Sequence, residues 1–291
     1  MAFDKPKALV LPLNFPQTFL PERRLLAQLL TFAQKGGSGD KVSIGAETDI
    51  PTGKSTGKVE PMIYYASGMG LITAKKDSSQ WQLGFTSLGH IIFQEDPFLS
   101  EPQTLWLLHL MLSRRLNLSS PASGVADAWF ALFAEGGFRL GSNFTQTSFA
   151  DFLVDRHGEK SYLKSLSGVV IRSYLEDSCL GHIDVLQSTT GDSFFKQSAP
   201  LEKSFFPFYA SYLYLVWDEL FTSEDQMALD FFSQETRLFS VMGWDESMVA
   251  RWLDWMTDKG IIQVDRYTGT PMLLRLQKTN QVLSNSYSEL I

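Results

Sequence analysis

The residues best suited to chemistry lie in one short run, residues 48–55 (TDIPTGKS). Gly53, Lys54 and Ser55 match the second half of a nucleotide hydrolase's phosphate-binding loop, whose amides cradle phosphate, whose lysine reaches the terminal phosphates and whose hydroxyl holds magnesium. The motif also needs a glycine five positions before Gly53, where Thr48 stands. Because residues 42–47 also make a poor preceding strand, a nucleotide hydrolase is only the minor alternative.

The same run suits phosphate binding by a winged helix-turn-helix. Amides and hydroxyls at a helix N-terminus bind phosphate because the donors and the helix dipole both point outward. A tyrosine farther along that helix, Tyr64 or Tyr65, could reach a base or sugar, and lysines on a following β-hairpin wing could contact the DNA backbone. The candidate nucleic-acid-binding residues are Lys54, Ser55, Thr56, Lys58, Tyr64, Lys75 and Lys76. The competing interpretation is a solvated turn used only for protein contacts.

Other reactive side chains form no convincing site. Cys179 and His182, with Asp177 and Asp184 nearby, are the only cluster resembling a metal site, and a zinc site would need further soft ligands. Cys179 has no identifiable base that would make it a nucleophile, and no serine lies in a Gly-x-Ser-x-Gly elbow. We therefore predict no catalytic residue, no metal site and no cofactor.

The elements that position the candidate residues form a helix-turn-helix followed by a hairpin. Residues 22–34 carry leucines at helical spacing and predict the first helix. The further predicted elements are a short helix at 42–47, a turn at 49–53, a helix from 57 or 58 to 67, strands at 71–75 and 81–85, and a helix at 86–93 capped by Thr86.

A second unit of this kind is predicted near the other end of the chain. Ser223 and Gln226 would form a capping box for a helix reaching about residue 232, and Asp245 would cap a helix through residue 256. Strands at 261–266 and 272–276 would complete a hairpin. Its basic candidates are Arg251, Lys259 and Arg266, which Asp245, Glu246, Asp254 and Asp258 surround. We therefore expect this unit to contact protein rather than DNA.

Between the two units the chain is predicted to be helical. Helices are expected at 104–115, 126–135, 147–156, 161–175 and 205–220, with loop and short strands at 181–199. The predicted fold is mainly α with small β-hairpins (α+β), as two winged helix-turn-helix units flanking a helical middle domain. The predicted divisions are an extended arm at 1–20, a winged unit at 21–96, the middle domain at 97–222, a second winged unit at 223–278 and a polar, fraying tail at 279–291.

Composition fits a folded protein that works in a reducing compartment. The chain has 291 residues, 44% hydrophobic and 20% charged, with a single cysteine. Its first residues do not have the pattern of a secretion signal, and the sequence has no apolar run of about 18 residues, so we expect a cytoplasmic protein with no membrane span. The net charge of −7 is uneven, since residues 1–90 carry +3, residues 91–222 carry −6 and residues 223–291 carry −4. The only net-positive part contains the candidate DNA-binding residues.

Several segments resemble the bacterial family catalogued as domain of unknown function 4007. They are residues 50–72 (IPTGKSTGKVEPMIYYASGMGLI), 86–96 (TSLGHIIFQED), 102–112 (PQTLWLLHLML) and Trp129-Phe130 followed by Phe133. The similarity covers about residues 20–270, most specifically 50–112, and is poor at 181–201. Members are often encoded beside sulfotransfer-type reductases in DNA phosphorothioation and phage-defence clusters. The resemblance therefore implies a binding or assembly role in DNA modification or restriction, and it transfers no catalytic residue.

The leading hypothesis is a non-catalytic DNA-binding accessory subunit of a phosphorothioation-type modification or phage-defence system. Its partners would be double-stranded DNA and other defence proteins, such as the neighbouring reductases. One alternative is a protein-interaction scaffold in such a system, supported by the acidic balance beyond residue 90 and the aromatic residues of 205–221. The other alternative is a transcription regulator.

Overall fold

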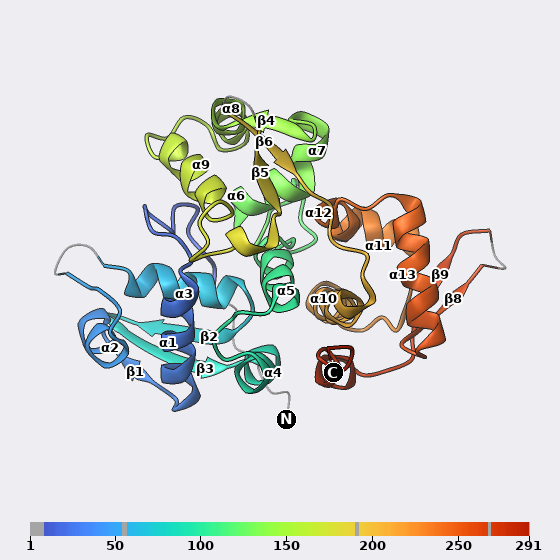
Figure 1. The fold of residues 1–291 in the computed structure, drawn as a ribbon, viewed down its shortest axis with the longest axis horizontal. Helices are drawn as coiled ribbons and strands as arrows, with labels where there is room; N and C mark the ends of the chain where they lie inside the picture. Colours follow the sequence, from blue (N-terminus) through green and yellow to red (C-terminus); the bar gives the residue numbers. More distant parts are fainter. Residues whose placement is uncertain (1–8, 54–56, 190–191, 267–268, 291) are drawn as a thin grey trace.

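Three small antiparallel sheets, each packed among helices, follow one another along the described part of the chain (Figure 1). The computed structural model describes residues 9–53, 57–189, 192–266 and 269–290. The expected mainly helical α+β class is confirmed. None of the described helices is long and apolar enough to cross a bilayer.

The first unit agrees with the predicted helices and hairpin. It contains α1 (Arg23–Gln34), β1 (Ser38–Gly39), α2 (Lys41–Thr48), α3 (Val59–Gly68), β2 (Ile72–Asp77), β3 (Gln80–Phe85) and α4 (Ser87–Glu95). The predicted apolar stripe of α1 is buried, including Leu25 and Leu29. Asp40 caps α2, and the Thr86 hydroxyl accepts from the Gly89 amide to cap α4 as predicted.

The middle segment, predicted to be helical with short strands only at 181–199, holds a three-stranded sheet whose first strand was not expected. It contains α5 (Pro102–Leu112), α6 (Asp127–Phe130), the π-helix η1 (Ala131–Glu135), α7 (Gly136–Arg139), β4 (Asn143–Thr145), α8 (Gln146–His157), α9 (Leu163–Arg172), the 3-10 helix η2 (Gly181–Ile183), β5 (Leu186–Ser188) and β6 (Ser193–Lys196). Strand β6 pairs with both β4 and β5. Two predicted helix bounds differ: the helical segment expected at 126–135 continues through the glycines to Arg139, and the helix expected at 147–156 begins at Gln146, with Thr145 as its cap.

The third unit confirms the predicted hairpin and corrects two other features. It contains the 3-10 helix η3 (Lys203–Phe205), α10 (Phe206–Leu220), β7 (Gln226–Ala228), α11 (Leu229–Thr236), α12 (Leu238–Met242), α13 (Glu246–Asp258), β8 (Ile262–Asp265), β9 (Met272–Arg275) and α14 (Thr279–Ser284). Gln226 begins a strand, so no capping box forms with Ser223. The tail does not fray, because Val282 and Leu283 of α14 are buried beside α10.

All three units share one order of elements. In each, a helical segment leads into a short strand, further helices follow, and a hairpin closes the unit. The first strand pairs with the last strand of the hairpin, giving the sheet orders β1-β3-β2, β4-β6-β5 and β7-β9-β8. The repeated topology shows that the middle segment is built like its two neighbours.

Helix α5 lies at the centre of the molecule and joins the units (Figure 1). Its residues from Thr104 to Leu112 are all buried, which explains its nearly continuous apolar sequence. The predicted helix over 104–115 ends at Leu112, and Arg114 turns into the interior. The Arg114 guanidinium donates to the Gly68 carbonyl of the first unit at 2.6 Å and to Glu219 of α10 at 2.6 Å. It therefore ties three segments together.

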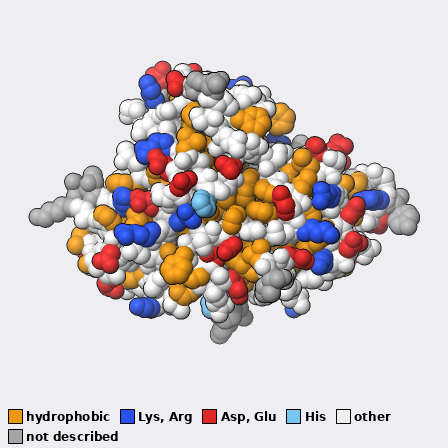
Figure 2. Space-filling model, in the orientation of Figure 1, with side chains coloured by type: hydrophobic (Ala, Val, Ile, Leu, Met, Phe, Trp, Pro, Cys, Tyr) orange, Lys and Arg blue, Asp and Glu red, His pale blue; other side chains and the backbone are white. Residues whose placement is uncertain are grey.

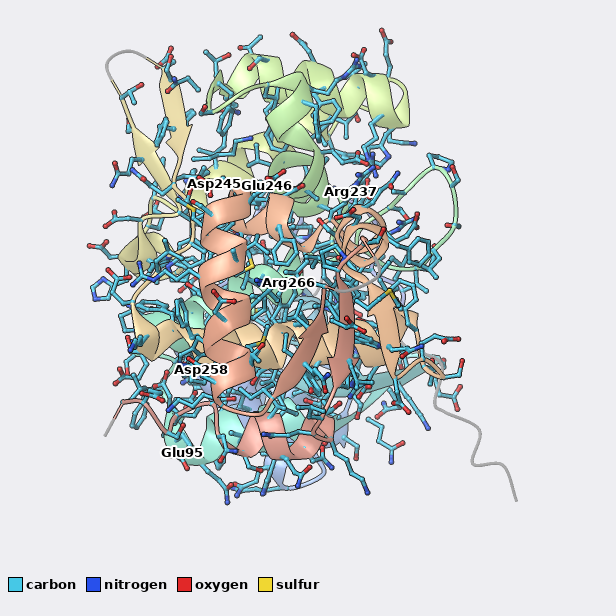
Figure 3. The ribbon with its side chains drawn as sticks, turned by 90° about the vertical axis from the view of Figure 1, so that its right-hand side faces the viewer. Glu95, Arg237, Asp245, Glu246, Asp258 and Arg266 are labelled. Carbon is cyan, nitrogen blue, oxygen red and sulfur yellow. The ribbon has the colours of Figure 1, made fainter. Side chains whose placement is uncertain are left out.

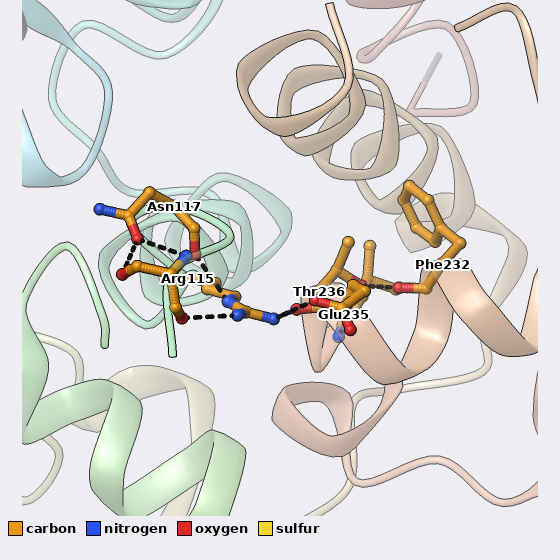
Figure 4. A network of polar contacts seen from close by, with 7 residues as sticks. Arg115, Asn117, Phe232, Glu235 and Thr236 are labelled. Atoms are coloured by element: carbon orange, nitrogen blue, oxygen red, sulfur yellow. Dashed lines mark hydrogen bonds and ion pairs between the residues drawn. The ribbon is translucent and has the colours of Figure 1, made fainter. Parts of the chain in front are cut away.

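Arg115 makes a second connection, between the middle segment and the third unit (Figure 4). Its guanidinium donates to the Glu235 carboxylate at 2.8 Å and also to the Glu235 backbone carbonyl. Within the middle segment, the guanidinium donates to the carbonyls of Asn117 at 2.7 Å and Ser119 at 3.0 Å. The side chain is only 7% exposed, so these bonds form largely shielded from water.

The described part of the N-terminal arm, residues 9–20, contains a turn at 13–18 and is not extended throughout. Phe15 is buried there. Its ring lies 4.9 Å from that of Tyr65 in the first unit and 5.7 Å from that of Trp129 in the middle segment. The arm thus contributes to the core between two units, because offset and edge-to-face ring pairs stabilise such contacts.

Candidate nucleic-acid interface

The predicted turn lies between α2 and α3. Lys54, Ser55 and Thr56 fall outside the described residues. The segments on either side are held together by an antiparallel bridge between Thr52 and Gly57 and by a 3.0 Å hydrogen bond from the Lys58 amide to the Pro51 carbonyl. The structure therefore fixes where the turn begins and ends on the surface.

Lys58 stands at the start of α3 as predicted, and its charge is already paired. Its ammonium donates to the Glu22 carboxylate, just before α1. The Lys58 side chain is 28% exposed. A phosphate at this position would compete with Glu22 for the ammonium group.

Lys76 and Tyr64 lie together around Trp81. The Lys76 ammonium is 2.6 Å from the Glu60 carboxylate and 4.9 Å from the centre of the Trp81 ring. Trp81 also donates to Glu60 at 3.3 Å, and the ring of Tyr64 meets that of Trp81 edge-on at 5.7 Å. Burial raises the pKa of Tyr64, so its phenol stays protonated at neutral pH. The cation of Lys76 is therefore shared between a carboxylate and a ring.

Lys75 differs from its neighbour. Side chains alternate across a strand, so Lys75 points to the face opposite Lys76. It is exposed and takes part in no ion pair among the described side chains. Of the four predicted residues that the structure describes, Lys75 alone combines an exposed side chain with an unpaired charge.

Helix α3 presents little surface of its own. Only Glu60, Tyr64 and Ser67 are partly exposed, and the rest of the helix is buried. Tyr65 is fully buried with its hydroxyl on the Phe19 carbonyl, so it cannot reach a base. The exposed stripe thus carries one carboxylate and no cation. In the first unit the groups suited to phosphate lie in the turn and the wing.

The third unit carries carboxylates where the first carries its candidate lysines. Asp245 and Glu246 stand at one end of α13 and Asp258 at the other, with Arg266 beside the helix (Figure 3). Arg266 lies 3.1 Å from Asp254, and both side chains are at least 60% exposed. Lys259 pairs with Glu289 at 2.7 Å. Arg251 remains exposed on α13.

A groove of about 520 Å³ runs between α13, α11 and the hairpin of the third unit. Its lining is mainly apolar, including Phe239, Trp244 and Leu253. Three carboxylates, Asp230, Asp245 and Glu246, and one cation, Arg266, also line it. An apolar floor with carboxylates is a poor site for a phosphate backbone and suits a protein segment.

A cluster of charged side chains in the middle segment has a structural role. Arg156 donates to Asp127 at 2.6 Å and to Glu135 at 2.6 Å, and His157 lies 2.9 Å from Asp127. Burial opposes ionisation of Asp127, yet hydrogen bonds from Arg156 and His157 hold its pKa well below the usual range. Cys179 is buried, which raises its thiol pKa to about 11 and disfavours the nucleophilic thiolate.

The fold is similar to that of SspB, known from a crystal structure and from a magnesium-bound crystal structure. Each match has a TM-score of 0.70 at 16% sequence identity and covers 95% of this chain and 87% of SspB. At this identity the likeness shows a common fold alone. No curated protein matches the sequence of this chain.

The magnesium in one SspB structure raises the question of a metal site here. Within the described ranges, no three His, Cys, Asp or Glu side chains gather where they could hold a metal ion. The partly buried carboxylates of Asp127 and Glu135 are already bound by Arg156. The described residues thus form no all-protein cage for magnesium, and the function proposed below assigns no residue to a metal.

The sequence resemblance noted above is confirmed by a family-level match. The family described as "Protein of unknown function (DUF4007)" matches residues 18–287, which is nearly the whole chain. The match spans all three sheets, including the segment 181–201 where the resemblance was poor. The chain therefore belongs to the DUF4007 family.

Proposed function

We propose that this protein is a non-catalytic DNA-binding accessory subunit of a bacterial DNA-modification or phage-defence system of the phosphorothioation type. Double-stranded DNA would be one partner, and other proteins of the system, such as a sulfotransfer-type reductase, would be the others. The family membership and the genomic neighbourhood that the resemblance implies support this choice of system.

One observation carries the proposal: the order of elements repeated three times along the chain. A helix, a strand, two helices and a hairpin, with the first strand paired to the last, is the arrangement of a winged helix-turn-helix. In such modules a helix enters the major groove, and neighbouring elements contact the backbone. In the third unit the short α12 is an addition between the two helices. We therefore assign a winged helix to each unit, including the middle one.

In the first unit the DNA contact would be made by the turn and the wing. Lys54, Ser55, Thr56 and Lys58 would meet phosphates at the start of α3, and Lys75 and Lys76 would touch the backbone from the wing. Tyr64 would contribute its partly exposed edge. The length of α3 itself would stay out of the groove, because its exposed stripe carries Glu60 and no cation.

Binding to a labelled duplex, with and without phosphorothioate and across a salt series, tests the proposal by fluorescence anisotropy. We expect micromolar or tighter binding that weakens steeply with salt, because neutralised phosphates release counterions. A preference between the two duplexes would identify the modification that is read. An absence of binding at low salt would refute the proposal.

The double variant Lys54→Ala/Lys58→Ala locates the contact. It should weaken binding similarly on all sequences and lower the salt slope by roughly one unit per lysine. Because Lys58 also pairs with Glu22, the matched control is Glu22→Gln, which removes the same ion pair and keeps the lysine. Equal losses in the two variants would show that the effect comes from the ion pair and not from phosphate.

A second candidate function, a protein-interaction scaffold, is favoured by the groove of the third unit. Its apolar floor and its carboxylates match a partner segment that is apolar and basic. On the face drawn in Figure 2, basic and acidic side chains are intermixed and form no single basic field. A stable complex with an untagged neighbouring protein, purified without DNA and lost in Leu253→Asp, would support the scaffold over the DNA-binding function.

A further inference from the structure

The three units share a topology but differ in charge at the element that would face DNA. From the turn to the end of the third helix, the first unit (residues 49–68) has two lysines and two carboxylates. The third unit (residues 237–258) has two arginines and four carboxylates. The middle unit (residues 158–172) has three cations and one carboxylate. Only the middle unit is net positive at this element.

Helix α9 of the middle unit displays its cations on one exposed face. Lys164 and Arg172 lie eight residues apart, so they share one side of the helix, and Ser165 is exposed beside them. The opposite side, including Leu166 and Val170, is buried. No carboxylate lies anywhere on α9. The third helices of the other two units both carry exposed or partly exposed carboxylates.

The turn that precedes α9 adds a third cation. Lys160 is exposed there, and neither Lys160 nor Lys164 has an ion-pair partner in the ranges the structure describes. Arg172 does pair, at 3.1 Å, with the exposed Glu176 beyond the helix. Such an exposed pair is weak, so a phosphate could replace the carboxylate.

A groove beside these lysines is lined by hydrogen-bonding groups. Its volume is about 580 Å³, and Lys160 and Lys164 line it together with Thr145, Thr147 and Ser161. Two carboxylates, Asp151 and Asp192, also line it, and these would repel a phosphate at their end of the groove. The cations and hydroxyls are therefore suited to the backbone of a nucleic acid rather than to a base edge.

We propose that the middle unit, through Lys160, Lys164 and Arg172, holds the phosphate backbone of duplex DNA. This inference rests on the proposed DNA-binding function and assigns the strongest backbone contact to α9 and its preceding turn. The reason is electrostatic. In the first unit Lys58 and Lys76 are already paired with carboxylates, and Lys75 alone of its described candidate lysines is unpaired. In the middle unit two described lysines, Lys160 and Lys164, are exposed and have no ion-pair partner.

The test is the double variant Lys160→Ala/Lys164→Ala in the full chain, titrated against a labelled duplex from 50 to 200 mM salt. Each lost phosphate contact should lower the salt slope by roughly 0.9, which is roughly an eightfold loss of affinity at 0.1 M salt. The double variant should therefore bind roughly sixtyfold more weakly than wild type at that salt. Circular dichroism and thermal melting check that it folds.

Lys35→Ala/Lys203→Ala is the matched control, because it removes two exposed lysines from other parts of the surface. It should keep the wild-type salt slope. If wild type binds the duplex and Lys160→Ala/Lys164→Ala binds with the same slope, the assignment to α9 is overturned while the proposed function stands. If wild type binds no duplex, the proposed function and the assignment to α9 both fail.

Discussion

The Arg114→Ala variant tests how far the three units depend on one buried guanidinium. The Arg114 side chain is 9% exposed and donates to the carbonyls of Gly68 and Met111, each at 2.6 Å. It also makes two bonds to Glu219, at 2.6 and 3.1 Å. Truncation leaves buried carbonyls without a donor and a carboxylate without its counter-charge.

The magnitude follows from burial. Removing one partner of a buried ion pair costs roughly 3–5 kcal/mol. Glu219 is 32% exposed and can recover part of its hydration, so we expect the lower end, about 3 kcal/mol. With a slope of about 3 kcal/mol per molar urea, the unfolding midpoint should fall by roughly 1 M. Equilibrium urea unfolding, followed by tryptophan fluorescence, measures this shift.

Two further variants test whether the loss comes from burial of the Arg114 ion pair. Arg266→Ala breaks an exposed pair with Asp254 and should cost about 0–1 kcal/mol. Glu219→Gln keeps an acceptor for Arg114 and should lose less than Arg114→Ala. If Arg114→Ala unfolds at the same urea concentration as Arg266→Ala, the claim that Arg114 holds the units together is refuted.

Three other outcomes are expected. In fluorescence anisotropy, Lys75→Ala should weaken duplex binding roughly eightfold at 0.1 M salt. Lys76→Ala should weaken it less, because Glu60 already neutralises the charge of Lys76. Burial lowers the pKa of His109 to about 3, so the unfolded chain binds the extra proton between about pH 3 and 6.5. The free energy of unfolding should therefore decrease as the pH is lowered from about 6.5 to 3, by up to about 1.4 kcal/mol per pH unit. His109→Gln should remove this contribution to the pH dependence, as measured by urea unfolding at several pH values. Leu283→Ala should cost about 2–4 kcal/mol in the same assay, because the side chain is 1% exposed; an unchanged midpoint would mean that α14 is not docked.

The sequence predicted those elements whose structure is decided locally. Regular apolar spacing located α1, and Thr86 and Asp245 cap the helices they were expected to cap. Two hairpins were found because each is formed by neighbouring strands. Short strands were expected at 181–199, where β5 and β6 lie, but the sheet was missed because β4 has only three residues and lies more than 40 residues before its partner β6. Such pairing depends on tertiary contacts, which short polar strands do not reveal.

The prediction of the candidate site from the sequence was limited by long-range contacts of the same kind. Lys58 was placed at the start of α3 from its spacing, but nothing local indicates its ion pair with Glu22. Lys75 and Lys76 were treated alike, although alternation along the strand directs only Lys76 toward Glu60. The sequence left open whether Tyr64 or Tyr65 would face outward. Tyr65 is the fully buried ring, because the N-terminal arm brings Phe15 onto it.

A net charge of −7 would argue against DNA binding if the surface were uniform. The repeated topology changes that argument, because each unit offers its own third helix and turn to a partner. The excess carboxylates of α13 make the third unit a poor neighbour for phosphate, and its apolar groove suits a protein. By contrast, the unpaired lysines on α9 and in its preceding turn make the middle unit the better neighbour for phosphate. Under the proposed function, DNA and a partner protein would occupy different units, which α5, Arg114 and Arg115 connect.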